Sequence, residues 1–418
     1  MKVIAAGMEE PRKDLYSMDI LIVGGGFAGV WSAAAAARVR EQTGAKLSIT
    51  VVSSSADLVI RPRLYEADPE RLRIPLSRIL PSIGVTQVTA TVSAIDTSTR
   101  TVSAVDGNGR RKLHYSRLVL AAGSTIRPAD LPGSEYLHNV DTIQGATALD
   151  KHLRSLPKAP GSRTVVVVGA GFTGLEVATE LVGRLTDLAS DAESADPPPR
   201  VVLVERADTV APDLGPGPRP AIEEALAKLG VEVRLGQTIA SVAADVVRFT
   251  DGTELPAGTV VWTAGVQASP LTAEIPGRRD PLGRLYVNEY LQVAEAPAVL
   301  AAGDTAAANA EEPGRLVLQS CQHAIPLGKY AGYNAAADLL GLPLAPFSPA
   351  PYATCVDLGA AGAVLTSGWE RTVVSTGDAA KQRKETTNRE RIYPPLDAAE
   401  LLRAADYQVG VRPPAAKI

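Results

Sequence analysis

The stretch Ile20-Leu-Ile-Val-Gly-Gly-Gly-Phe-Ala-Gly29 decides the fold of this chain. Its apolar start predicts a buried strand, and glycines 24, 26 and 29 form the pattern GxGxxG before an alanine-rich run that predicts a helix. In such a turn Gly24 permits the tight reversal, Gly26 lets the backbone approach a pyrophosphate, and Gly29 lets the helix pack closely on the strand. One motif of this kind is a weak signal, because glycine-rich turns are common.

The same order of signals recurs in the second half of the chain. Thr164 to Val168 predicts a strand, GxGxxG follows at glycines 169, 171 and 174, and a helix is expected after it. Each copy continues with a second strand (47–52 and 201–205), a β-meander, and a closing strand that ends in Ala-Gly (122–123 and 264–265). The repeat predicts two Rossmann-like domains of an α/β fold, each built on a parallel sheet, and therefore two bound dinucleotides.

Composition and charge exclude several classes of protein. With 418 residues, 45% of them hydrophobic and 21% charged, the chain can form two or three packed domains. The 42 basic and 46 acidic residues give a net charge of −4, which argues against nucleic acid as a partner. Two cysteines and four scattered histidines offer neither a disulfide framework nor a metal-site spacing, so we expect no metal and a cytoplasmic location.

The uncharged run Ile20 to Ala37 is the one stretch that resembles a membrane segment. It contains four glycines, follows acidic residues, and passes from a β-rich run into an alanine-rich one, which predicts a strand, a turn and a helix instead. We therefore expect no integral membrane segment. Peripheral contact with a membrane stays open, as does a homodimer.

The last residue of each second strand bears on which dinucleotide is bound. Glu205 ends this strand in the second copy, where a carboxylate bonds ribose hydroxyls and repels a 2′-phosphate, so NADH is expected. The adjacent Arg206 could bind that phosphate, which leaves NADPH as the alternative. In the first copy the place is taken by Ser53, either a ribose partner or a polar turn residue.

A third signal, the apolar strand that ends in Gly303-Asp304, completes a resemblance to a known family. With GGGFAG (24–29), LAAGS (120–124), GAGFTGLE (169–176), VVWTAGV (260–266) and AAGDTA (301–306), the chain resembles the two-dinucleotide-binding flavoprotein reductases of the pyridine-nucleotide disulfide oxidoreductase superfamily. Within it, type II NADH dehydrogenases are most similar, over roughly Asp19 to Gly341. The resemblance implies that FAD binds the first copy together with the segment after Gly265, and that NADH binds the second copy as an inserted domain.

The resemblance also assigns roles to single residues. Asp304 matches the residue that holds the ribityl chain, and Glu176 matches a catalytic glutamate near the stacked nicotinamide and flavin; an ordinary first-turn helix acid is the alternative for Glu176. His323 either touches the flavin or is a packing residue. The expected cofactor-binding residues are Gly24, Gly26, Phe27, Ala28, Gly29, Ser53, Ala122, Gly123, Gly303, Asp304, His323 and Ala324 around FAD, and Gly169, Gly171, Phe172, Thr173, Gly174, Glu205, Ala264 and Gly265 in the second copy.

Departures from the family pattern narrow the expected chemistry. The first cysteine is Cys321, so the redox pair of the disulfide reductases is missing. The AQxAxQQG pattern of type II enzymes reads Cys-Gln-His-Ala-Ile-Pro-Leu-Gly over 321–328, with Pro326 and Leu327 in place of two glutamines. Because proline suits a first helical turn, we expect the helix to persist. A less polar acceptor pocket is then expected between this helix start and the strands around Tyr352 to Val356.

The predicted organisation is an FAD domain in two parts (1–140 and 268–345), an NAD(P)H domain (141–267) and a small C-terminal α+β interface domain (346–418). A polar insertion before Val201 is expected on a surface loop, and the charged run Lys381 to Arg391 as a solvated face or a docking site for an acidic partner or anionic lipid. The predicted function is hydride transfer from NADH to FAD and on to a small-molecule acceptor such as a quinone. The alternatives are a soluble NAD(P)H-dependent flavoenzyme acting on another small molecule, and a redox-regulated binding flavoprotein similar to apoptosis-inducing factor.

Overall fold

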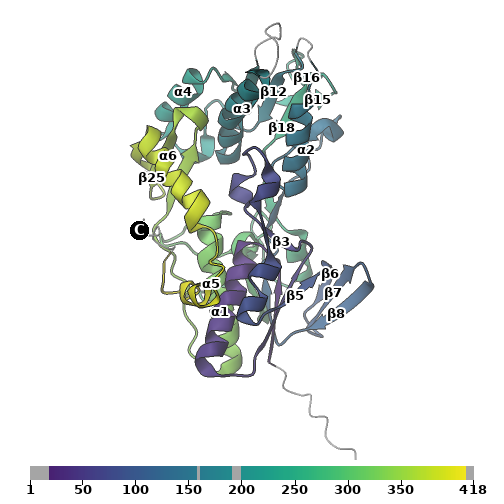
Figure 1. Ribbon diagram of the computed structural model, residues 1–418, viewed down its shortest axis with the longest axis vertical. Coiled ribbons are helices and arrows are strands. Elements are labelled where there is room, and N and C mark those ends of the chain that lie inside the picture. Colours follow the sequence, from purple (N-terminus) through teal and green to yellow (C-terminus); the bar gives the residue numbers. More distant parts are fainter. Residues whose placement is uncertain (1–17, 158–160, 191–198, 411–418) are drawn as a thin grey trace, which may run out of the picture.

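A computed structural model describes residues 18–157, 161–190 and 199–410 of the chain. Two halves lie one above the other, each built around a parallel sheet (Figure 1). The insertion predicted as a surface loop falls mostly outside the described residues.

The first sheet is organised around the strand that leads into the first glycine turn. β1 pairs in parallel with β2 on one side and β9 on the other, and β22, from much later in the chain, extends the sheet past β9. Across the sheet the strands are β21 (Gln292–Val293), β22 (Ala296–Ala301), β9 (Arg117–Leu120), β1 (Asp19–Val23), β2 (Ser48–Ser53) and β5 (Thr86–Thr89). The late segment thus belongs to the first sheet, in agreement with the family resemblance, which joined the segment after Gly265 to the first copy.

The second sheet repeats the order of the first. Its strands are β11 (Leu137–His138), β18 (Thr259–Trp262), β12 (Thr164–Val168), β13 (Arg200–Val204) and β14 (Glu232–Arg234), all parallel. The closing, first, second and third strands neighbour one another in both sheets, so the predicted α/β fold with two Rossmann-like sheets is confirmed.

Each copy also carries the predicted meander as a small antiparallel sheet. The first consists of β6 (Thr91–Asp96), β7 (Thr101–Asp106) and β8 (Gly109–His114), and the second of β15 (Ile239–Val242), β16 (Val246–Phe249) and β17 (Glu254–Pro256). Two-stranded pairs complete the halves: β3 (Asp57–Val59) with β4 (Arg73–Pro75), β10 (Ser124–Ile126) with β19 (Val266–Ala268), and β20 (Leu285–Tyr286) with β23 (Ala306–Ala307).

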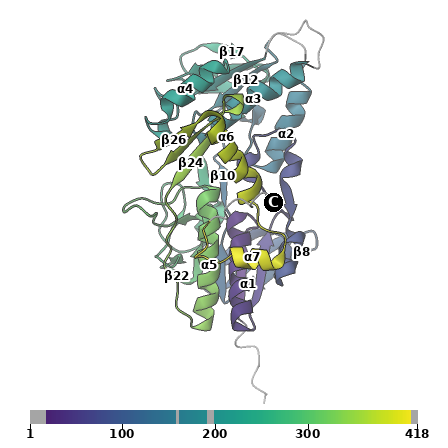
Figure 2. The ribbon, with the colours of Figure 1, turned by 60° about the vertical axis from the view of Figure 1, so that its left-hand side comes forward.

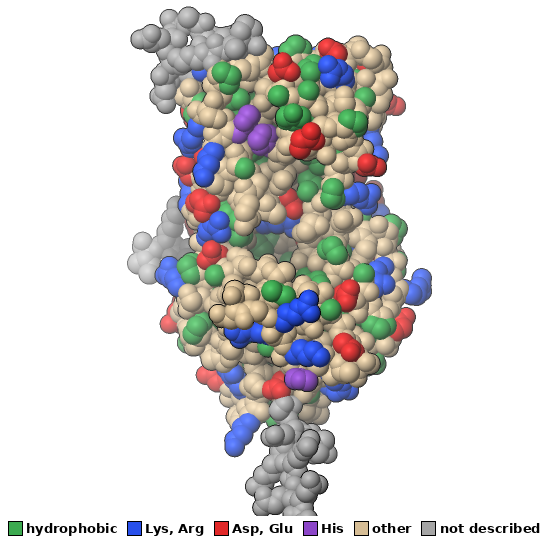
Figure 3. All heavy atoms as spheres, turned by 90° about the vertical axis from the view of Figure 1, so that its right-hand side faces the viewer, with side chains coloured by type: hydrophobic (Ala, Val, Ile, Leu, Met, Phe, Trp, Pro, Cys, Tyr) green, Lys and Arg blue, Asp and Glu red, His purple; other side chains and the backbone are tan. Residues whose placement is uncertain are grey.

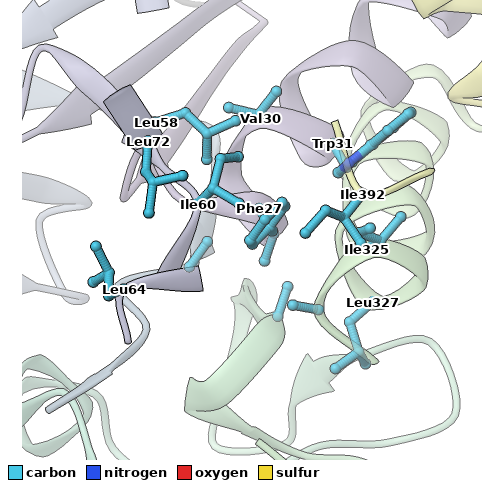
Figure 4. Packing of buried hydrophobic residues seen from close by; sticks show 14 of the residues in the cluster. Phe27, Val30, Trp31, Leu58, Ile60, Leu64, Leu72, Ile325, Leu327 and Ile392 are labelled. Carbon is cyan, nitrogen blue, oxygen red and sulfur yellow. The ribbon is translucent and has the colours of Figure 1, made fainter. Parts of the chain in front are cut away.

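Helix α1 (Phe27–Thr43) follows the first glycine turn and is buried on almost every side. The sheet covers one face, and α5 (Cys321–Leu340) lies alongside the other (Figure 2). Gly328 and Gly332 allow this approach, since a Cβ on Gly332 would lie 2.0 Å from the Ser32 carbonyl oxygen. Phe27 and Val30 of α1 belong to one buried hydrophobic cluster with Ile325 and Leu327 of α5 (Figure 4).

The remaining elements lie around the second sheet and in the C-terminal part. The helices near the second sheet are α2 (Ile143–Arg154), α3 (Phe172–Ser190) and α4 (Arg219–Lys228). The C-terminal part contains the antiparallel strands β24 (Ala353–Asp357), β25 (Ala363–Ser367) and β26 (Thr372–Thr376), helix α6 (Gly377–Thr386), a π-helical turn (Thr387–Arg391) and helix α7 (Ala398–Ala404). Within the described ranges, no helix has the length and apolar character needed to cross a bilayer.

Two expectations about the late segments are wrong. Pro326 lies inside α5, in its second turn rather than its first, because the helix already begins at Cys321. Its ring nitrogen therefore leaves the Gln322 carbonyl without the usual helical donor. The run Lys381 to Arg391 is not simply a solvated face, since α6 turns Lys384 into the interior, where the residue is 6% exposed.

Candidate functional site

The first glycine turn has the shape that a pyrophosphate requires. Gly24 has φ of +118°, and a Cβ there would lie 2.1 Å from the Ala121 carbonyl oxygen, so only glycine fits. A Cβ on Gly29 would lie 1.9 Å from the Gly24 carbonyl oxygen. Above Gly26, by contrast, no atom of another described segment lies within 4 Å of the Cβ position. The open space at the start of α1, with its free amides, fits a dinucleotide phosphate.

Three separate segments meet beside this turn. A Cβ on Gly303 would lie 2.8 Å from the Ala28 Cβ and 3.7 Å from the Ala324 Cβ, so the end of β22, the start of α1 and the start of α5 converge. A Cβ on Gly25 would contact the Ser53 hydroxyl at 2.8 Å, which places the end of β2 at the same edge. The residues predicted around FAD that the structure brings to this edge are Gly24, Gly26, Phe27, Ala28, Gly29, Ser53, Ala122, Gly123, Gly303, Asp304 and Ala324.

Asp304 stands in a polar cluster that the motifs did not reveal. The Ser124 hydroxyl donates to Asp304 Oδ2 at 2.6 Å, and Arg61 Nη1 lies 3.4 Å from the same oxygen. Arg61 also bonds the Ser124 hydroxyl at 2.8 Å and forms an ion pair with Asp141. Asp304 therefore keeps Oδ1 for a further donor such as a ribityl hydroxyl. Ser124 is the last residue of the LAAGS motif, whereas Arg61 and Asp141 belong to none of the sequence motifs.

The second glycine turn repeats the geometry of the first. Gly169 has φ of +100°, and a Cβ on Gly174 would lie 1.7 Å from the Gly169 carbonyl oxygen. A Cβ on Gly171 would have one neighbour within 4 Å, Asp213 Oδ2 at 3.8 Å, so this approach is also open. The predicted residues Gly169, Gly171, Phe172, Thr173, Gly174, Glu205, Ala264 and Gly265 lie around the carboxyl ends of β12, β13 and β18.

Glu205 is held in place at the end of β13 by two backbone amides. Oε2 accepts from the Ala170 N–H at 2.7 Å and Oε1 from the Ala207 N–H at 3.0 Å, and the residue is 8% exposed. The carboxylate thus links the second strand to the glycine turn. Each oxygen has a lone pair left for a ribose hydroxyl.

Glu176 forms a buried ion pair with a residue from the C-terminal part. Lys384 Nζ lies 2.7 Å from Glu176 Oε1, which also accepts from the Asp357 N–H at 3.1 Å, and Nζ lies 5.4 Å from the centre of the Phe172 ring. Burial opposes the charge on Lys384, but Glu176 outweighs it and holds the pKa of Lys384 above its ordinary value. Glu176 is 5% exposed and in the second turn of α3, so the alternative of an ordinary first-turn helix acid is wrong.

Sequence reasoning missed Lys384 because its charged surroundings suggested solvent. Lys384 lies one α6 turn beyond Lys381, which pairs with Asp357 near the surface. The charged residues on either side of Lys384 gave no sign that this lysine reaches the start of α3.

Figure 3 shows the side of the molecule with α2 and β8, which is hollowed at mid-height between the two halves.

His323 lies inside the start of α5 rather than on its surface. It is 1% exposed, its Nδ1 lies 3.2 Å from the Ser320 hydroxyl, and its ring stacks on Tyr352 with centroids 5.3 Å apart. Burial lowers the pKa of His323 to about 4, so the imidazole is neutral near pH 7. The Gln322 amide faces the backbone of Ala353, which confirms that the helix start and the terminal strand are adjacent.

The predicted acceptor pocket needs one correction. Leu327 is fully buried in the core cluster with Phe27, so it does not line a pocket between the α5 start and β24. Its side of the helix faces the interior, because α5 packs along α1.

Comparison with known proteins agrees with this geometry. The family model for pyridine nucleotide-disulphide oxidoreductases matches residues 18–328. An NADH dehydrogenase-like protein of Mycobacterium tuberculosis is 45% identical over 94% of this chain and 99% of its own length. A demethylphylloquinone reductase of Synechocystis is 28% identical over 83% of this chain and 86% of its own length.

A solved structure shows the same fold at low sequence identity. NDH2 from Plasmodium falciparum, in complex with NADH, superposes with a TM-score of 0.75 and 13% identity over 93% of this chain and 98% of that chain. The family model covers well over half of the residues, and the solved structure has the same fold. The chain belongs to the pyridine nucleotide-disulphide oxidoreductase family.

Proposed function

We propose that this chain passes the hydride of NADH through FAD to a quinone. As a member of its family it is an NADH oxidoreductase that uses FAD. The observation that carries the proposal is the presence of two complete glycine turns without a reactive thiol pair. Burial raises the pKa of both Cys321 and Cys355 to about 11, so neither is poised as the thiolate that disulfide reduction needs.

The residues of the chain divide the work between the two turns. Held at the first turn, FAD would supply the two-electron chemistry that links NADH to the second substrate. The amides at the start of α1 bind and orient one pyrophosphate, and Asp304 accepts from the ribityl chain with its free oxygen. Glu205 holds the NADH ribose, and the Lys384–Glu176 pair closes the start of α3, where it excludes water from the nicotinamide.

Support for a quinone comes from the relatives. The Synechocystis match is named a demethylphylloquinone reductase, and a 28% identical protein of Mycobacterium tuberculosis, covering 68% of this chain, is named a type II NADH:quinone oxidoreductase. A different small-molecule acceptor is the second candidate, because Pro326 removes an amide side chain from the pattern of the quinone enzymes.

Anaerobic mixing separates these functions. The FAD-loaded protein is reduced with one equivalent of NADH, which should bleach the flavin absorbance, and is then mixed with menadione, a short-chain ubiquinone, a dye or oxygen. Rapid reoxidation by a quinone, faster than by oxygen, is the expected result. Reoxidation by none of the quinones would refute the quinone proposal, and a stable reduced complex with every acceptor would instead favour a binding flavoprotein.

A further inference from the structure

A second cavity, apart from both glycine turns, lies between the outer side of the α1–α5 pair and the C-terminal segment. It has a volume of about 280 Å³ and is bounded by α1, α5, α7 and the segment from Arg391 to Pro395. α1, α5 and α7 come together in Figure 2. Much of its wall is apolar, with Trp31, Ile325 and Ala404 among its lining residues. The volume is close to the lower end of ligand pockets, which start near about 300 Å³.

Two residues that line this cavity carry a buried donor that has no acceptor among the described residues. Trp31 is 4% exposed, and within the described residues its Nε1–H has no hydrogen-bond partner. Arg391 Nε is buried and, over the same part of the chain, likewise unpaired. Indole and guanidinium nitrogens can donate only, so an occupant that satisfies them must bring acceptor oxygens. Unpaired buried donors are rare in folded proteins, and each calls for a partner.

Positive charge gathers at the same cavity. Lys329 is 4% exposed, with Nζ 4.9 Å from the centre of the Trp31 ring and donating to the Val409 carbonyl at 2.9 Å. Arg391 and Arg403 also line the cavity, and across the ranges that the structure describes none of these three cations forms an ion pair. Glu400 is the carboxylate among the lining residues, and nearby Asp406 pairs with Arg38 instead.

Burial opposes the charge on Lys329. It lowers the pKa of this lysine to about 8, against the opposing effect of Asp406, so the ammonium still predominates at pH 7 but lacks, among the described residues, the compensation of a carboxylate in direct contact. A negatively charged group in the cavity would supply it. The apolar part of the wall, in turn, favours a hydrocarbon or aromatic body over a cluster of water molecules.

We propose that this cavity binds a small amphipathic carboxylate. Its carboxylate accepts from Lys329, Arg391 and the Trp31 indole, and its apolar body lies against Ile325 and Ala404. The proposal is independent of the proposed hydride transfer, because none of these side chains belongs to the glycine turns or to the Glu176–Lys384 pair.

Calorimetry with two matched probes tests the proposal on the full-length, FAD-loaded chain. Decanoate is compared with 1-decanol, which has the same chain length without the charge. We expect one decanoate per chain and at least tenfold weaker binding of decanol. Lys329→Met should weaken decanoate binding at least tenfold, and Trp31→Phe, which keeps an aromatic ring but removes the donor, should weaken it by a smaller factor. Arg110→Met, an exposed cation on β8, is the control and should change nothing.

Each other outcome overturns the proposal in a distinct way. Equal binding of decanol and decanoate would show an apolar cavity without anion recognition. Binding of menadione that Lys329→Met leaves unchanged, without decanoate binding, would assign the cavity to a neutral ligand. No heat with either probe would mean a hydrated cavity. If Lys329→Met fails to fold, Arg403→Met replaces it with the same expectation, because Arg403 lines the cavity and is not ion-paired within the described chain.

Discussion

The two glycine turns are built alike but are covered by different parts of the chain. In both halves a strand, GxGxxG, a helix and a second strand recur, with the same order of neighbouring strands. Behind the first turn, α1 is enclosed along its length by α5, at backbone contact distance. Behind the second, α3 meets the C-terminal part through the buried ion pair of Glu176 with Lys384 and through a backbone approach, since a Cβ on Gly359 would lie 2.6 Å from the Thr179 carbonyl oxygen.

This difference teaches that the local motif sets the turn while the covering element sets how firmly it is closed. Two helices in backbone contact separate only at the expense of their whole packed interface. The cover of α3, by contrast, comes from a short part of the C-terminal segment, through the Glu176–Lys384 pair, the Asp357 N–H bond to Glu176 and the approach of Gly359 to Thr179.

The largest loss of stability is expected when the lysine of the buried Glu176–Lys384 pair is removed and the glutamate is kept. Lys384→Met leaves the Glu176 carboxylate buried without its cation, which should lower the free energy of unfolding by about 3–5 kcal/mol. The double variant Glu176→Gln/Lys384→Met removes both charges and should recover most of that loss. Lys381→Met is the matched control on the same helix: its pair with Asp357 is partly exposed and worth about 0–1 kcal/mol. Urea unfolding measures all four proteins, and equal losses for Lys381 and Lys384 would contradict a special role for the buried pair.

The next largest effect tests the helix contact behind the first turn. Gly332→Ala would place a Cβ 2.0 Å from the Ser32 carbonyl oxygen, so α1 and α5 must move apart at a cost of about 1–3 kcal/mol. Gly183→Ala in α3 is the control, because no atom lies within 4 Å of its Cβ position. That change should stabilise the protein by about 0.5–1 kcal/mol, since alanine is the better helix former. Thermal unfolding of both variants would contradict the comparison if their shifts had the same sign.

A third, similar effect concerns retention of the flavin. Asp304→Ala removes a charged acceptor from the predicted ribityl site, and a hydrogen bond to a charged group is worth about 1.5–3 kcal/mol. The FAD dissociation constant should therefore rise about 10-fold to 150-fold, measured by fluorescence of FAD released on dialysis. Asp338→Ala at the other end of α5, where Asp338 pairs with Arg117, should leave FAD in place. Flavin retention unchanged by Asp304→Ala would remove this residue from the site.

The features that the sequence could predict depend on residues that lie close together along the chain. The turns, the sheets and the position of Glu205 follow from residues within about one βαβ unit, where glycine spacing and alternating apolar residues act through backbone geometry. That the segment after Gly265 belongs with the first copy was implied by the family resemblance, and β22 does lie in the first sheet. The roles of the individual residues and the domain boundaries stay predictions.

What it could not predict depends on segments that meet only in the folded chain. Lys384 lies more than 200 positions after its partner Glu176, in a run whose charges suggested solvent. Arg61 reaches Asp141 and Asp304 from a short 3-10 helix (Arg61–Arg63) that matches no motif. Pro326 was placed in a first turn because proline favours that position, whereas packing against α1 sustains α5 through the proline.

The smallest effect is expected where the two turns differ by a single residue. Glu205 ends the second strand of one copy and Ser53 that of the other, so Glu205→Ser makes the second turn resemble the first. The KM for NADH should rise about tenfold, because a charged acceptor of ribose hydroxyls is lost. NADPH should be affected less, since the repulsion of its 2′-phosphate is relieved at the same time, and the preference for NADH should narrow.

Arg206 provides the opposite test of the same pocket. Arg206→Ser should lower the rate with NADPH more than the rate with NADH. The arginine guanidinium can bind the 2′-phosphate that only NADPH carries, whereas serine has no charge to neutralise this phosphate. Steady-state rates with both dinucleotides over a range of concentrations measure the two ratios. A wild-type protein that prefers NADPH, or a ratio that neither variant moves, would show that the end of β13 does not recognise the ribose. The amide bonds of Glu205 to Ala170 and Ala207 would then be its whole role, as a residue that only shapes the turn.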